Sequence, residues 1–213
     1  MHKIDLGILG EESPGEKLER ADAAANRRLI LRTAAMLFEE QGVANVTMAD
    51  IASAAGVGKG TLYRRFDNKA ELALALMDNQ MSIFQNEVLA QLREYGQQGR
   101  SNLFRVDYFL DALVTFTDSH LPLLCVVQSG GLVTEGRERS RPYHWQHQTI
   151  GGLLQRAIEA GELGTSVDVS YTADALLAPL RADIFRFQRE VRGFSLERIS
   201  SGLRALAPAL VAP

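Results

Sequence analysis

The chain has 213 residues, of which 46% are hydrophobic, and its formal net charge is −3. This length supports a folded core, and the charge balance by itself argues against a nucleic-acid binder. The one cysteine, Cys125, excludes an internal disulfide and fits a reducing compartment. No run approaches 18 consecutive apolar residues and no signal peptide is evident, so we expect a soluble, cytoplasmic protein that does not associate with a membrane.

The N-terminal residues 1–25 contain glycines, a proline and scattered charges, which is typical of a flexible arm in which a helix could begin at Glu16. The first firm helix is predicted over 26–41, because apolar residues recur there at helical spacing. Gly42 is expected to end it. The inner side of this helix is formed by Ile30, Ala34, Leu37 and Phe38.

A helix-turn-helix is predicted between Val46 and Lys69. Thr47 and Asp50 have the spacing of a capping box, and Gly56 stands where a left-handed residue would end the first helix. Apolar residues recur at helical spacing in both helices, namely Ile51, Ala52 and Ala55 in the first and Leu62 and Phe66 in the second. In such a motif the second helix enters the major groove of DNA.

The outward positions of the second helix suit contacts with DNA. Lys59, at its N-terminal end, can donate to guanine O6 or N7, and Gly60 allows the backbone to approach closely. The hydroxyl groups of Thr61 and Tyr63 suit phosphate oxygens, and the arginines that follow add charge. The complete set of candidate DNA contacts is Thr47, Lys59, Gly60, Thr61, Tyr63, Arg64, Arg65 and Lys69.

The next helix begins with a second capping box, formed by Asn68 and Glu71. Lys69 would lie in the first turn of that helix, where a cation opposes the helix dipole unless a phosphate is close. Positive charge is concentrated in this region, because residues 26–76 carry seven Lys/Arg against five Asp/Glu in an otherwise acidic chain. The excess is small, so we expect tight binding only from two reading heads in a dimer.

The segment AGVGKGTLYRRFDNKAEL, residues 55–72, resembles the signature of the tetracycline-repressor (TetR) family of bacterial transcription regulators, which runs roughly A-G-V-S-x-G-T-L-Y-x-Y-F-x-x-K-x-x-L. The chain departs from it at Gly58, where a capping Ser is common, and at Arg65, where an aromatic residue or His is common. The resemblance covers about residues 27–75 and implies an all-helical ligand domain after the head. The matching positions are Ala55, Gly56, Val57, Gly60, Thr61, Leu62, Tyr63, Phe66, Lys69 and Leu72.

The rest of the chain also reads as helical, with no alternating strand pattern longer than about four residues. A long helix is predicted over 69–95, followed by a break at 96–101. Further helices are predicted over 102–119, 121–133, 142–160, 169–191 and 195–211. We therefore expect an all-α protein with a flexible arm (1–25), a three-helix helix-turn-helix DNA-binding head (26–75) and a ligand-binding and dimerisation domain (76–213).

The resemblance implies a small-molecule pocket among the middle helices of the body. The candidate ligand residues are Phe104, Tyr108, Phe116, Cys125, Gln128, His144, Trp145 and His147, with Phe109, Leu113 and Tyr143 as neighbours. The alternative is that these aromatic side chains simply form core. His144 and His147 share a helix face and could chelate a metal, but two ligands do not make a site. We therefore predict neither a metal nor a cofactor.

The last two predicted helices carry long apolar stripes. In the TetR family the corresponding helices pair with their symmetry mates in the dimer, and the alternative is that they only complete the core of one protomer. The candidate interface residues are Leu177, Leu180, Ile184, Phe187, Leu203 and Leu206, accompanied by Leu176, Val191, Ile199 and Leu210.

The sequence thus favours a ligand-responsive repressor that binds a palindromic operator in double-stranded DNA as a homodimer and is released by an unknown small molecule. A DNA-binding dimer without a small-molecule ligand, either constitutive or controlled by a partner, is the alternative. An enzyme is disfavoured, because the chain has no glycine-rich phosphate loop, nucleophile elbow or paired metal-ligand motif.

Overall fold

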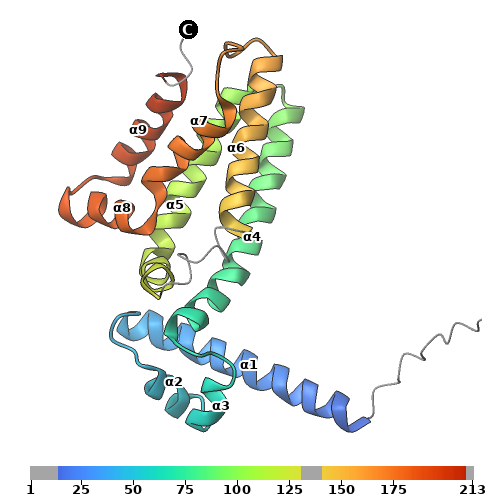
Figure 1. The fold of residues 1–213 in the computed structure, drawn as a ribbon, viewed down its shortest axis with the longest axis vertical. Coiled ribbons are helices and arrows are strands. Elements are labelled where there is room, and N and C mark those ends of the chain that lie inside the picture. Colours follow the sequence, from blue (N-terminus) through green and yellow to red (C-terminus); the bar gives the residue numbers. More distant parts are fainter. Residues whose placement is uncertain (1–13, 131–140, 210–213) are drawn as a thin grey trace, which may run out of the picture. The chain divides into compact units, whose positions relative to one another are not determined.

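The computed structural model describes residues 14–130 and 141–209 (Figure 1). The regular structure in these two ranges is entirely helical, which confirms the predicted fold class. The chain divides into two compact units, Met1–Asp67 and Asn68–Pro213, which we describe separately. The boundary expected near residue 75 lies inside a continuous helix of the second unit. Of the expected flexible arm, residues 1–13 lie outside the described residues.

The first unit contains α1 (Pro14–Gln41), α2 (Met48–Ala54) and α3 (Lys59–Tyr63). α1 begins at Pro14 rather than at the expected Asn26. The intervening sequence is rich in alanine and in charged residues with good helix propensity, and proline suits the first turn of a helix. The three helices share a core of buried apolar side chains, which are Ile30, Ala34, Phe38, Val46, Ile51, Leu62 and Phe66.

The second unit begins with α4 (Lys69–Gln97), α5 (Asn102–Ser129) and α6 (Arg141–Glu159). The predicted break in α5 at Pro122 was wrong, because the helix continues through this residue. A proline inside a helix costs about 3 kcal/mol. The buried Leu121 and Val127 on either side hold α5 against the core, and we attribute the continuity of the helix to their packing.

The C-terminal part consists of short helical segments. These are α7 (Val169–Leu177), a 3₁₀ turn (Ala178–Leu180), α8 (Ala182–Arg186), a π-helical turn (Phe187–Val191) and α9 (Leu196–Ala209). The prediction of one helix over 169–191 was wrong. Pro179 has no N–H to donate and Arg181 adopts an extended ψ of 138°, so the chain turns before α8. Leu210 lies outside the described residues.

α5 is the central helix of the second unit. It packs against α4, α6, α8 and α9, and the buried side chains of these helices form one core around Phe109, Leu113, Leu153 and Phe185. By length and composition α5 could cross a membrane, and it is the one such helix among the described residues. A central core helix meets the same criteria, and its packing on four other elements identifies α5 as a core helix.

Candidate functional site

The start of α2 is fixed by the predicted capping box. The Thr47 N–H donates to Asp50 Oδ2 at 2.8 Å, and the Asp50 N–H donates to Thr47 Oγ1 at 3.2 Å. The hydroxyl of Thr47 donates a further bond to the same carboxylate at 2.7 Å. These bonds from Thr47 lower the pKa of Asp50. The capping box therefore holds a charged carboxylate at the positive end of α2.

The turn between α2 and α3 depends on Gly56. Its φ of +64° lies in the left-handed region, and a Cβ built there would meet no atom within 4 Å, so glycine is required here by backbone conformation and not by space. The Val57 N–H then donates to Ala52 O at 3.0 Å and closes the turn. This geometry sets the direction in which α3 leaves α2.

α3 has an apolar inner side and an open outer side. Leu62 is fully buried, and Phe66, just after the helix, is nearly so, whereas Tyr63 is 48% exposed. A Cβ on Gly60 would meet nothing within 4 Å, so this part of the helix is open to a large partner. The positions on the outer side are Lys59, Gly60, Tyr63 and Arg64, and the more recessed Thr61 lies beside them.

Two of the candidate DNA-contact residues, Arg65 and Thr47, differ from the open positions on the outer side of α3. Arg65 is half-buried, and its Nε is buried without a hydrogen-bond partner in the described part of the chain. Thr47 is exposed and already engaged with Asp50. Beside them, Gly58 is the N-cap of α3 and provides no side-chain cap, as its departure from the family signature suggested.

Lys69 occupies the first turn of α4. The Glu71 N–H donates to Asn68 Oδ1 at 3.0 Å, so Asn68 caps this helix as expected. Lys69 is half-buried, and partial desolvation lowers the pKa of its ammonium group. The arrangement places a cation in the first turn of a helix, the end that the helix dipole makes positive.

Residues 30–76 match the sequence model of the bacterial regulatory proteins of the tetR family. The chain belongs to the TetR family. It is 29% identical over 178 residues to an HTH-type transcriptional regulator of Staphylococcus aureus strain MRSA252, a match that covers 84% of this chain and 90% of the relative. This TetR-family protein is accordingly a DNA-binding transcriptional regulator.

Solved structures of transcriptional regulators share its fold. The FadR repressor of Thermus thermophilus, solved in complex with lauroyl-CoA, has a TM-score of 0.65 and 22% identity, with 88% of this chain and 96% of that chain covered. A regulator of Saccharomonospora viridis, solved with choline, has a TM-score of 0.65 and 20% identity, with 85% and 95% covered.

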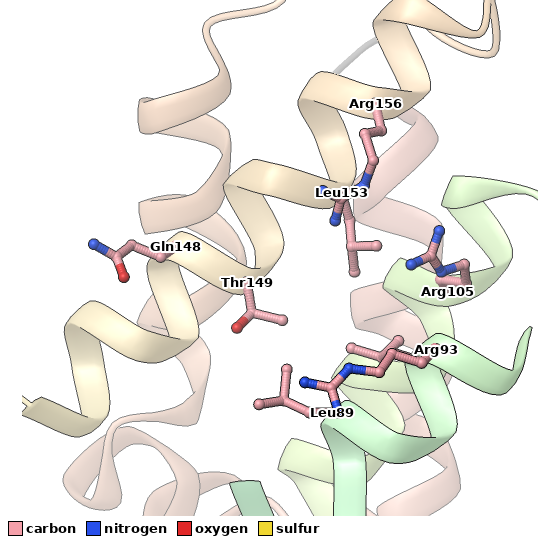
Figure 2. Close-up of a pocket in the computed structure, with 8 residues that line it drawn as sticks. Leu89, Arg93, Arg105, Gln148, Thr149, Leu153 and Arg156 are labelled. Carbon is pink, nitrogen blue, oxygen red and sulfur yellow. The ribbon is translucent and has the colours of Figure 1, made fainter. Parts of the chain in front are cut away.

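A pocket of about 390 Å³, partly open to solvent and called the cavity below, lies between α4, α5 and α6 of this TetR-family body (Figure 2). Three leucines line it, and three arginines reach it from three different helices. Its lining residues are Leu89, Leu92 and Arg93 on α4, Arg105 on α5, and Gln148, Thr149, Leu153 and Arg156 on α6. None of the eight ligand residues expected from the sequence is among them.

Part of the expected ligand set forms an aromatic cluster instead. The ring of Trp145 lies edge-on to Phe109 at 5.3 Å and to Phe84 at 6.0 Å between centroids, and Phe84 packs on Phe116 at 4.4 Å. His120 stacks on Phe116 at 4.3 Å. Phe84 was not among the candidates, because its spacing in α4 reads as ordinary core.

The remaining candidates are scattered over the second unit. Phe104 and Tyr108 each pack edge-on against Tyr95, and burial raises the pKa of the Cys125 thiol. Elsewhere, Gln128 accepts a bond from the Asp183 N–H, His144 is exposed, and His147 Nε2 lies 3.5 Å from Asp174. No group of three metal-binding side chains occurs in the described ranges.

The candidate interface residues fall into two groups. Leu177 and Leu203 are buried in the core of their own protomer, and Leu180 is half-buried. Ile184, Phe187 and Leu206 are 39%, 48% and 41% exposed. Val191, in the π-helical turn, is 69% exposed. Large apolar side chains are therefore left uncovered on consecutive segments from α8 to α9.

Proposed function

We propose that this protein is a ligand-responsive repressor that binds a palindromic operator as a homodimer and is released by a small molecule. The observation that carries the proposal is the open outer side of α3, with Lys59, Gly60, Tyr63 and Arg64 exposed above the buried Leu62. A short helix held rigidly from below and polar above is suited to reading a major groove.

The proposed contacts divide into reading and positioning residues. Lys59, at the N-terminal end of α3, is assigned to base edges, where a lysine can donate to guanine. Gly60 allows close approach of the backbone. Phosphate contacts are assigned to Thr47, Thr61, Tyr63, Arg64, Arg65 and Lys69, which supply hydroxyl groups and charge but little sequence information.

The exposed apolar side chains of α8 and α9 support a homodimer. Large apolar side chains exposed together on neighbouring segments are candidates for an interaction site, since large exposed apolar patches on proteins often mark such sites. A two-fold axis would bring Ile184, Phe187 and Leu206 of one protomer against the same surface of its partner, with Val191 at the edge. Leu177 and Leu203, which are buried in the core of their own protomer, would support this surface by packing beneath it. The two DNA-binding heads of the dimer would then bind two half-sites of the operator that are related by the same two-fold axis.

The cavity between α4, α5 and α6 is the proposed effector site. It falls in the size range of small-ligand pockets and combines apolar with polar walls. FadR regulators of Thermus thermophilus and Bacillus subtilis, which share this fold, were solved with lauroyl-CoA and stearoyl-CoA. A helical body of this type can therefore hold a small molecule, and we assign that role to this cavity.

α4 is the proposed connection between effector and DNA. It carries Lys69 in its first turn and Leu89, Leu92 and Arg93 in the cavity wall. At 1.5 Å per residue, about 30 Å of helix separates Lys69 from Leu89. A ligand that favours one position of α4 over another would change the affinity for DNA, by about 1–3 kcal/mol in an ordinary allosteric protein.

The alternative is a DNA-binding dimer that needs no small molecule. The packing of Phe84, Phe109, Phe116 and Trp145 favours this alternative, because these aromatic side chains contact one another where the sequence predicted a ligand pocket. The cavity lies elsewhere, among the arginines. The two functions differ in whether any ligand of that cavity weakens binding to the operator.

Selection of DNA from a random library by the purified protein tests the proposal directly. We expect enrichment of a sequence with two-fold symmetry, whose half-sites are separated by one or more helical turns. Enrichment of a single unrepeated half-site would contradict the homodimer. If no sequence is enriched and the affinity depends only on the salt concentration, the result would contradict operator recognition.

A further inference from the structure

The charge of the cavity is unusual for a small-ligand pocket. Arg93 comes from α4, Arg105 from α5 and Arg156 from α6, and no acidic residue belongs to the lining (Figure 2). The apolar remainder is supplied by Leu89, Leu92 and Leu153. One cavity thus combines three cations with an aliphatic wall.

Within the described ranges, none of the three guanidinium groups forms an ion pair with a carboxylate within 4.0 Å. The carboxylate that acts on Arg105, that of Glu162, is engaged in capping α5. It accepts from the Asn102 N–H and the Leu103 N–H, both at 2.9 Å, and from Asn102 Nδ2 at 3.0 Å.

Arg105 is the most constrained of the three. Its side chain is half-buried, its Nη1 donates to Asn102 Oδ1 at 3.1 Å, and its Nε is buried without a hydrogen-bond partner among the described residues. Desolvation is the main cause that lowers its pKa, followed by repulsion from Arg156. A buried donor without an acceptor is uncommon in folded proteins, and an anionic oxygen would satisfy it.

Two of these guanidinium groups lie beside glycines. A Cβ on Gly96 of α4 would lie 3.6 Å from the guanidinium of Arg105, and a Cβ on Gly152 of α6 would lie 3.6 Å from Arg156 Nη2. Both separations are ordinary van der Waals contacts, so each guanidinium lies beside a glycine of a neighbouring turn or helix, with Arg105 half-buried and Arg156 exposed.

We infer that this cavity binds a small anionic amphiphile, whose carboxylate or phosphate group lies among Arg93, Arg105 and Arg156 and whose aliphatic part lies on Leu89, Leu92 and Leu153. Guanidinium groups match both anions with paired donors. The inference deepens the proposed function, because this ligand would be the effector that acts through α4. Binding itself is a separate question from regulation and can be measured without DNA.

Titration calorimetry on the full chain tests the inference with three eight-carbon probes, octanoate, octyl phosphate and octan-1-ol. We expect one of the two anions to bind at least tenfold more tightly than the alcohol, and the stronger of the two identifies the head group. Equal affinity for octan-1-ol would overturn the role of the arginines. Inorganic phosphate that binds as tightly as octyl phosphate would overturn the role of the leucines.

Arg105→Gln and Arg156→Gln should each weaken binding of the preferred anion at least tenfold. Arg100→Gln is the matched control, because Arg100 lies over the Phe104 ring, 5.0 Å from its centroid, outside the lining. If Arg105→Gln does not fold, as judged by circular dichroism, the more exposed Arg93→Gln takes its place. Unchanged affinity in the folded variants, or no binding of any probe, would overturn the inference.

Failure of this inference can be told apart from failure of the proposed function. Absence of probe binding by a protein that still recognises its operator would reject only the anionic amphiphile. Tight probe binding that leaves the affinity for DNA unchanged would support the site and reject its regulatory role. The two measurements therefore have independent outcomes.

Discussion

Gly130, directly after α5, lies against Ala70 in the first turn of α4, so closely that a Cβ built on Gly130 would overlap the Cβ of Ala70. The end of the central core helix thus touches the turn of α4 that carries Lys69. Only a residue without a side chain fits at this point. Motion of α5 relative to α4 would therefore be transmitted to the beginning of α4.

Gly130→Ala should destabilise the second unit because of this close approach. Forcing a methyl group into a filled space costs about 1–3 kcal/mol, which would appear as a lower midpoint in urea unfolding. Ala70→Gly removes the opposing methyl group, so the double variant should recover most of the stability. If Ala70→Gly does not rescue Gly130→Ala, the overlap is not the cause.

Lys59→Ala should reduce both affinity and sequence preference. Removing a bond to a base edge costs about 1–3 kcal/mol of discrimination, so preference should relax at one position of each half-site. Fluorescence anisotropy with a set of single-base variants of the selected operator measures this effect. An affinity that falls equally on all these sequences would show that Lys59 binds phosphate and not a base.

Lys69→Ala should weaken binding to all DNA sequences alike. Removing one cation from a phosphate lowers the steepness of log K against log salt concentration by about one. The comparison with Lys59→Ala at several salt concentrations separates the two roles. A selective effect on one sequence, with an unchanged salt slope, would be inconsistent with the phosphate assignment.

Phe187→Asp should convert the dimer into a folded monomer. A buried, unpaired charge at an apolar interface is strongly unfavourable, whereas position 187 of the monomer is 48% exposed and leaves the new carboxylate hydrated. Light scattering after gel filtration gives the mass. Tyr171→Asp on α7 is the control, because Tyr171 is 69% exposed and lies outside the proposed interface. Dimerisation that survives Phe187→Asp places the interface elsewhere.

Asp183 at the start of α8 should make stability depend on pH in the acid range. The hydrogen bonds from Arg181 lower the pKa of this carboxyl group from 3.8 to about 2. A depressed pKa in the folded state stabilises the protein above the pKa of the unfolded state, and this contribution is lost as pH falls from about 4 to about 2. Asp183→Asn should therefore flatten the fall in unfolding free energy over that range. An identical slope in both proteins would exclude this ion pair as its source.

The helix-turn-helix was predictable because its signals are local. Thr47 and Asp50 bond across three residues, Gly56 has the left-handed φ that its position demanded, and Leu62 and Phe66 point inward as their spacing indicated. Each of these features depends on neighbours within one or two turns of helix. The sequence therefore contained enough information to place the outer side of α3.

The cavity was not predictable in the same way. Its lining comes from three helices that are separated in the chain, and an arginine such as Arg105 looks like any solvated cation until those helices are assembled. Aromatic side chains such as Phe116 suit a ligand wall because they are large, yet in the structure Phe116 packs on Phe84 instead. At Pro122, core packing prevailed over local propensity, whereas at Pro179 the local effect of proline prevailed and the helix broke.

The measurement that tests the central claim most directly is binding of the purified protein to the intergenic DNA upstream of its own gene, by mobility shift and footprinting at fixed salt. We predict a protected palindrome that one dimer occupies and that Lys59→Ala no longer protects. Binding that shows no preference over random DNA at the same salt concentration, with Lys59→Ala indistinguishable from the unaltered protein, would contradict the assignment of α3 as a reading helix at that site.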